Sequence, residues 1–129
     1  VELNYMACRD LDERLDYYTP VIITSDEVIE SDPDMIKAFL RATKKGYEDA
    51  MADPDAAAEL LASHVTAYDP EMLKISQEYL TDKYMEDTDT WGIIDETRWN
   101  NYTNFMQEYG VIDTAISADA CFTNEFLPE

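Results

Sequence analysis

The sequence predicts a mostly α-helical chain with two short strands at its N-terminal end, forming the closing part of a larger α/β domain. The β-branched run Val21–Thr24 has the composition of a strand that is buried on both faces. After it, three Asp-Pro pairs mark the starts of successive helices. Two short strands do not make a stable sheet alone, so we expect the other strands of the domain to lie upstream.

The first of the two strands is predicted from an alternation of apolar residues, Val1, Leu3, Tyr5 and Ala7. A charged stretch over residues 9–16 separates it from the second strand. The chain opens on Val1 rather than on Met and enters the alternating pattern at once. We therefore expect it to be a segment of a longer protein.

Helix starts are predicted at Asp32-Pro33, Asp53-Pro54 and Asp69-Pro70. In each pair the Asp carboxylate can accept a backbone N–H as the N-cap, and the proline ring fixes a φ that suits the first helical position. The first of these helices should run to about Met51. The side chains expected to face a core are Ile36, Phe39, Leu40, Thr43, Tyr47, Ala50 and Met51 in the first helix, Ala57, Leu60, Leu61 and Val65 in the second, and Met72, Ser76, Tyr79, Leu80 and Tyr84 in the third.

A fourth helix is predicted after Asp95, which can serve as its N-cap. Gly110 is placed to end it in a left-handed conformation. Its apolar stripe is mostly aromatic and consists of Trp99, Tyr102, Phe105, Met106 and Tyr109. The tail, residues 117–127, is expected to form a short helix and to fold back through Phe122, Phe126 and Leu127.

The charge of the chain excludes two classes of direct partner. Nine Lys and Arg residues stand against 29 Asp and Glu residues, which gives a formal net charge of -20. Such a field repels the phosphates of nucleic acids and the anionic headgroups of membranes. The longest uninterrupted apolar run, residues 21–23, is far too short to span a bilayer.

Few residues offer catalytic or metal-binding chemistry. His64 is the single histidine, and its place near the end of the second helix indicates a surface or boundary residue. Cys8 and Cys121 lie at no metal-ligand spacing, and we interpret them as small buried residues rather than a disulfide or a reactive thiol. Among 29 acidic residues no acid/base pair stands out. We therefore predict no catalytic residue, no metal and no cofactor.

Residues 87–92 match the first half of a calcium-binding loop in their alternating oxygen-bearing side chains and their sixth-position Gly92. The fifth position, however, is Trp91 and the twelfth is Arg98, neither of which can ligate calcium. An acidic turn that leads into the fourth helix is the better interpretation. The three glycines of the chain form no phosphate-binding loop, which argues against nucleotide binding.

Two aromatic residues are candidates for ligand binding. Tyr17 and Tyr18 lie in a non-helical stretch just before the apolar run, where side chains at a strand entry can face a cleft. They could stack on a planar ligand, or they could fill the seam between a strand and a helix. Trp91 is a similar candidate, whereas Trp99 on the stripe of the fourth helix should belong to the core.

Seven short segments, in this order, together resemble one protein family. They are Asp16-Tyr17-Tyr18-Thr19-Pro20-Val21-Ile22-Ile23, Ile29-Glu30-Ser31-Asp32-Pro33-Asp34, Lys37-Ala38-Phe39-Leu40-Arg41-Ala42-Thr43 with Gly46-Tyr47, Asp53-Pro54-Asp55-Ala56-Ala57, Trp91-Gly92 with Trp99, Glu108-Tyr109-Gly110-Val111-Ile112, and Phe122-Thr123-Asn124-Glu125-Phe126-Leu127-Pro128. The chain is thereby similar to substrate-binding proteins of ABC importers, of the thiamine-pyrimidine-precursor and sulfonate-nitrate-taurine type, within the type 2 periplasmic-binding-protein superfamily.

The resemblance implies a two-lobed α/β protein that closes around a small molecule and delivers it to permease subunits in the membrane. On this map, residues 1–24 are the strands and hinge passage that return to the first lobe, and residues 25–129 are the C-terminal helical part of that lobe. Asp10 joins Tyr17 and Tyr18 as a candidate ligand-binding residue, and the expected ligand is a thiamine pyrimidine precursor. The family also implies an extracytoplasmic location, in the periplasm or as a membrane-anchored lipoprotein.

Two other functions stay open. The same superfamily resembles the pyrimidine-forming synthases of thiamine biosynthesis, which carry a cysteine-rich metal motif that this segment lacks. The chain could also be a stand-alone acidic helical interaction domain. Such a domain should have a closed apolar core, whereas the end of a larger domain should expose an apolar surface that drives dimerisation.

Overall fold

The computed structural model describes residues 4–86 and 88–129, and the part of the chain that it describes is mostly helical without any strand. It divides into two compact units. Residues 4–24 and Ile94–Glu125 form one, which we call the α5 unit. Ser25–Ile93, described apart from residue 87, and Phe126–Glu129 form the other, the α1–α4 unit.

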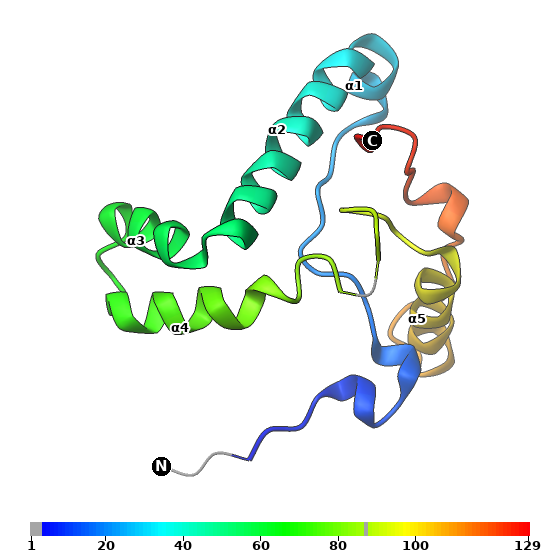
Figure 1. Ribbon diagram of the computed structural model, residues 1–129. Coiled ribbons are helices and arrows are strands. Elements are labelled where there is room, and N and C mark those ends of the chain that lie inside the picture. The colour runs from blue at the N-terminus through cyan, green and yellow to red at the C-terminus, as the bar shows by residue number, and fades with distance from the viewer. Residues whose placement is uncertain (1–3, 87) are drawn as a thin grey trace. The chain divides into compact units, whose positions relative to one another are not determined.

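The α1–α4 unit consists of α1 (Asp26–Ser31), α2 (Pro33–Ala52), α3 (Pro54–His64) and α4 (Pro70–Thr81), with α3 packed along α4 (Figure 1). The three predicted helix starts are confirmed. The N-cap carboxylates of α2, α3 and α4 accept backbone N–H groups of Met35, Ala56 and Glu71 at 3.1, 3.0 and 2.8 Å. α1 is an additional helix outside the four predicted ones, and Ser25 caps it with its hydroxyl.

Few side chains of the α1–α4 unit are buried among the residues that the structure describes, and the apolar ones are Ile36, Ala58 and Trp91. Tyr47 of α2 lies between the rings of Trp91 and Tyr84. Its ring centroid lies 5.3 Å from that of Trp91 and 4.9 Å from that of Tyr84. The stripe predicted for α2 therefore faces the core, apart from Phe39, which is exposed. Trp91 is part of this core rather than a free ligand-stacking ring.

The stripes predicted for α3 and α4 are mostly wrong. Leu60 and Leu61 of α3 and Met72 and Tyr79 of α4 are all exposed, Leu60 at 64% and Tyr79 at 66%. An apolar stripe is buried only where a second surface covers it, and the packing of α3 on α4 leaves these four side chains uncovered. The uncovered apolar face is compatible with a segment of a larger domain.

The α5 unit is built around α5 (Glu96–Glu108), with three short 3₁₀ turns at Cys8–Asp10, Glu13–Leu15 and Ala118–Ala120. Asp95 caps α5 by accepting the N–H of Arg98 at 2.8 Å, as predicted. Gly110 follows the helix with φ +66°, which confirms the left-handed end.

The tail of the α5 unit lies against its helix. Trp99 packs against Phe122 with ring centroids 5.4 Å apart, and Ala118 is buried. The helix predicted in the tail is reduced to the single 3₁₀ turn Ala118–Ala120.

The two predicted N-terminal strands are wrong for the residues that the structure describes. Residues 4–7 are irregular and pass into a 3₁₀ turn, and residues 21–24 have no regular secondary structure. Val21 and Ile22 are half exposed and Ile23 is 88% exposed. A strand needs a neighbouring strand for its hydrogen bonds, and none exists within residues 4–86 and 88–129. Val1 and Leu3 lie outside the described residues.

The interpretation of the cysteines as buried residues is also wrong. Cys8 and Cys121 are free and exposed. Each lies at a 3₁₀ turn on the surface of the small α5 unit, which has too little core to cover them. His64 is exposed at the last position of α3, which confirms its assignment to the surface.

Candidate functional site

The stretch that contains both candidate tyrosines lies against one face of α5. Tyr17 stacks on Tyr102, with ring centroids 4.7 Å apart and planes inclined by 22°. The Tyr18 hydroxyl accepts the backbone N–H of Asp95 at 2.8 Å. Residues 95, 98 and 102 are spaced three and four apart, which places them on the same side of the helix. That face of α5 therefore fixes where residues 16–18 run.

Arg98 clamps this stretch to the helix. Its Nε donates to the Asp16 carbonyl oxygen at 3.1 Å, and its Nη2 donates to the Asp16 carboxylate at 2.9 Å. The guanidinium carbon also lies 4.3 Å from the centroid of the Tyr18 ring, within the range of a cation–π contact. A single side chain thus holds both the backbone before Tyr17 and the ring after it.

A second arginine, Arg14, holds the segment that precedes the two tyrosines. Arg14 donates from Nη2 to the Asp12 carboxylate at 2.7 Å and from Nη1 to Glu108 at 2.6 Å, and its guanidinium lies 5.0 Å from the Phe105 ring centroid. Hydrogen bonds from Arg14 lower the pKa of Asp12, and those to Asp12 and Glu108 raise the pKa of Arg14. Both groups therefore stay charged at neutral pH, which keeps residues 12–15 against α5.

Asn124 anchors the start of α5 from the other end of the sequence. Its side-chain oxygen accepts the N–H of Ile94 at 3.1 Å, and its side-chain nitrogen donates to the Ile94 carbonyl at 2.8 Å. The side-chain amide of Asn124 thus pairs with both the N–H and the carbonyl of the Ile94 backbone, as a neighbouring strand would. It holds the backbone just before Asp95, whose N–H in turn contacts Tyr18.

The two tyrosines differ in which of their groups remain available to a ligand. Tyr18 uses its hydroxyl on Asp95, and its ring lies under Arg98. Tyr17 is 47% exposed although one side of its ring faces Tyr102. The site can thus present one face of the Tyr17 ring to a ligand, while Tyr102 supports the opposite face.

Asp10, the third predicted site residue, is exposed on the turn Cys8–Asp10. In the part of the chain that the structure describes, no hydrogen bond joins its side chain to Tyr17 or Tyr18. The assignment of all three residues to ligand binding stays a prediction.

Sequence reasoning missed Arg98 and Tyr102 as supports of this site. A signal was available, because Arg98 is one of only nine cationic residues and follows the N-cap Asp95 by three positions. Tyr102 was assigned to the apolar stripe of the helix without a partner. Neither position shows by itself that residues 16–18 lie against it.

Residues 4–86 and 88–129 contain no group of three or more His, Cys, Asp or Glu side chains arranged to hold a metal ion. No helix among them has the length and apolarity needed to cross a membrane. Asp87 of the rejected calcium loop lies outside the described residues.

The chain is similar to known proteins in two respects. A family model described as NMT1/THI5 like matches residues 1–57. The riboflavin-binding protein RibY of Chloroflexus aurantiacus is 25% identical over 134 residues, which cover 99% of this chain and 37% of RibY. The chain thus spans little more than a third of the length of this curated relative. Both similarities support the substrate-binding protein family and a role in solute binding.

Proposed function

We propose that this chain is part of an extracytoplasmic solute-binding protein of an ABC importer, and that its α5 unit contributes an aromatic surface to the binding of a small planar ligand. The similarity to the NMT1/THI5-like family and to a riboflavin-binding protein supports the solute-binding role. The location, the permease subunits and the two-lobed α/β parent are parts of this proposal that come from the family resemblance.

The observation that carries the ligand site is the exposed ring of Tyr17. Tyr102 fixes the ring from one side, so that stacking on its free surface costs little additional ordering of the side chain. Tyr18 acts as a positioning residue, because its hydroxyl and ring are already engaged by α5. The exposed Asp10 carboxylate would accept hydrogen bonds from ligand N–H or O–H groups.

The ligand proposed is a planar nitrogen heterocycle. A thiamine pyrimidine precursor fits the family resemblance, and riboflavin fits the name of the relative RibY. Both offer a flat aromatic face, and aromatic stacking tolerates different ring systems because each has a π-face. The site residues in this chain therefore favour the class of ligand, and binding measurements must decide between its members.

Replacement of Tyr17 by Ala should weaken riboflavin or pyrimidine-precursor binding by about tenfold or more, because loss of a ring stack costs roughly 1–3 kcal/mol. The measurement is a titration of the longer protein that contains this chain, with riboflavin fluorescence and with thermal shift for the pyrimidine. Tyr109→Ala removes another exposed tyrosine of the same unit, 62% exposed against 47% for Tyr17, and serves as the control.

Equal affinities for the Tyr17→Ala and Tyr109→Ala proteins would contradict the assignment of Tyr17. Stabilisation of the 129-residue chain as strong as that of the longer protein would contradict a cleft between two lobes, since the chain would then bind the ligand by itself. Stabilisation by taurine or alkyl sulfonates but by neither heterocycle would refute the proposed ligand class.

The uncovered apolar side chains should also make the isolated chain self-associate. Ile22 is 52% and Ile23 is 88% exposed, in a segment whose composition favours a strand. Sedimentation velocity of the chain should show dimers or larger species at tens of micromolar, and Ile22→Glu with Ile23→Glu should shift it toward monomer. A chain that stays monomeric at these concentrations would instead support a stand-alone domain.

A further inference from the structure

The few cationic residues of this acidic chain are unevenly distributed. Lys37, Arg41, Lys44 and Lys45 lie within nine consecutive positions of α2, although the whole chain has only nine Lys and Arg residues against 29 acidic ones. α2 therefore carries a local positive strip on a strongly negative molecule.

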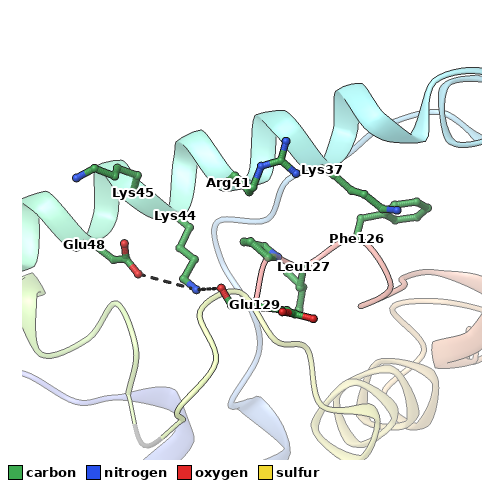
Figure 2. Close-up of a pocket in the computed structure, with 9 residues that line it drawn as sticks. Lys37, Arg41, Lys44, Lys45, Glu48, Phe126, Leu127 and Glu129 are labelled. Carbon is green, nitrogen blue, oxygen red and sulfur yellow. Dashed lines mark hydrogen bonds and ion pairs between the residues drawn. The ribbon is translucent and has the colours of Figure 1, made fainter.

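This strip forms one wall of a groove of about 560 Å³. The opposite wall is the tail segment Phe126–Glu129, which belongs to the same α1–α4 unit (Figure 2). The groove is lined by Lys37, Arg41, Lys44, Lys45, Glu48, Phe126, Leu127, Pro128 and Glu129. Cations and apolar groups thus face the same space.

The tail wall is held at two points. Lys44 Nζ donates to the main-chain oxygen of Glu129 at 2.7 Å. Leu127 Cδ2 lies only 3.2 Å from the position that a Cβ would take on Gly92, a residue with φ +80°. The glycine lets the tail approach the turn after Trp91 closely, so the groove has two built walls rather than one helix face.

The four cations are not equally available. Lys45 is paired with Asp49 at 2.5 Å, and Lys44 contacts Glu48 at 3.9 Å as well as Glu129. Lys37 and Arg41 form no ion pair with any of the residues that the structure describes. They are four positions apart on the helix and hence neighbours on its surface. Figure 2 shows Lys37 extending toward the Phe126 end of the groove.

We propose that this groove is a second binding site, for a small organic anion such as a phosphate monoester with an apolar or aromatic body. The Arg41 guanidinium can hold two oxygens of a phosphate at once, and Lys37 supplies a second positive charge beside it. Phe126 and Leu127 provide an apolar surface for the body of the ligand. The volume lies within the range of small-molecule binding sites.

The test is a titration of the chain with phenyl phosphate, followed by amide chemical shifts in NMR. We expect saturable shifts at residues of α2 and the tail, and at least a tenfold loss of affinity in Lys37→Gln with Arg41→Gln. Lys74→Gln with Lys83→Gln is the matched control, because it removes two positive charges of the same unit, one from α4 and one from the turn that follows it, without touching the groove. Circular dichroism confirms that each variant is folded.

Four outcomes would overturn the proposal. Shifts without saturation would do so, as would an equal loss of affinity in the control variant, because both indicate a general response to charge. Inorganic phosphate that binds as tightly as phenyl phosphate would show that the apolar wall contributes nothing. A polyglutamate peptide that binds more tightly than phenyl phosphate through Lys37 and Arg41 would assign the groove to an acidic polypeptide.

Discussion

Replacing Trp91 by Ala should destabilise the α1–α4 unit by about 3 kcal/mol, the largest effect that we expect from a single substitution in this chain. Trp91 is 7% exposed and packs against Tyr47, which in turn contacts Tyr84. The unit has only a few buried side chains, so removal of its largest one leaves a cavity with little else to fill it. Urea unfolding followed by circular dichroism measures the change.

Tyr68→Ala is the control for this experiment, because it removes an exposed aromatic ring of the same unit. It should change the unfolding free energy by no more than about 0.5 kcal/mol. A Trp91→Ala protein that keeps its stability but loses ligand affinity would show that Trp91 is a ligand-stacking residue. That result would contradict its placement in the core.

Helix starts were predictable because they depend on local chemistry. The cap pairs at Asp32, Asp53 and Asp69 need only one carboxylate, one proline and a backbone N–H within three residues. The same applies to Asp95 and to the left-handed Gly110. All five features are confirmed, since nothing distant along the chain is required for any of them.

Burial was not predictable in the same way, because it depends on a second surface. Leu60 and Tyr79 lie on regular apolar stripes yet are exposed, and the apolar run around Ile23 forms no strand. A periodic pattern states which face could be buried but not whether a partner surface is present within the same chain. These failures share one physical cause, the absence of covering strands and helices from the described residues.

The candidate site was predictable only in part. The two adjacent tyrosines before the apolar run stood out from the sequence, whereas their different contacts, Tyr17 with the Tyr102 ring and Tyr18 with the Asp95 backbone, depend on α5. Arg98 lies 82 positions from Asp16 along the chain, and no local pattern connects the two. Contacts of this kind become visible only when the fold brings both segments together.

Replacing Arg98 by Ala should destabilise the α5 unit by about 2 kcal/mol, the second large effect that we expect. The substitution removes two hydrogen bonds to Asp16 and the contact with the Tyr18 ring. The Arg98 side chain is only 22% exposed, so water replaces these interactions incompletely. Arg98→Lys keeps the charge, but a single ammonium group cannot replace the two guanidinium nitrogens that donate to Asp16. This substitution should lower the free energy of unfolding by about 1 kcal/mol.

A double-mutant cycle separates this clamp from a general charge effect. The cycle of Arg98→Ala with Asp16→Ala should give a coupling energy of at least about 1 kcal/mol. The cycle of Lys74→Ala with Asp55→Ala, an exposed ion pair at 3.1 Å, should give a coupling energy of only roughly 0.3 kcal/mol. If Arg98 holds residues 16–18 as described, Arg98→Ala should also weaken ligand binding through Tyr17, although Arg98 itself need not touch the ligand. Equal coupling energies in the two cycles would mean that Arg98 is an ordinary surface charge and that α5 does not fix the position of Tyr17 through it.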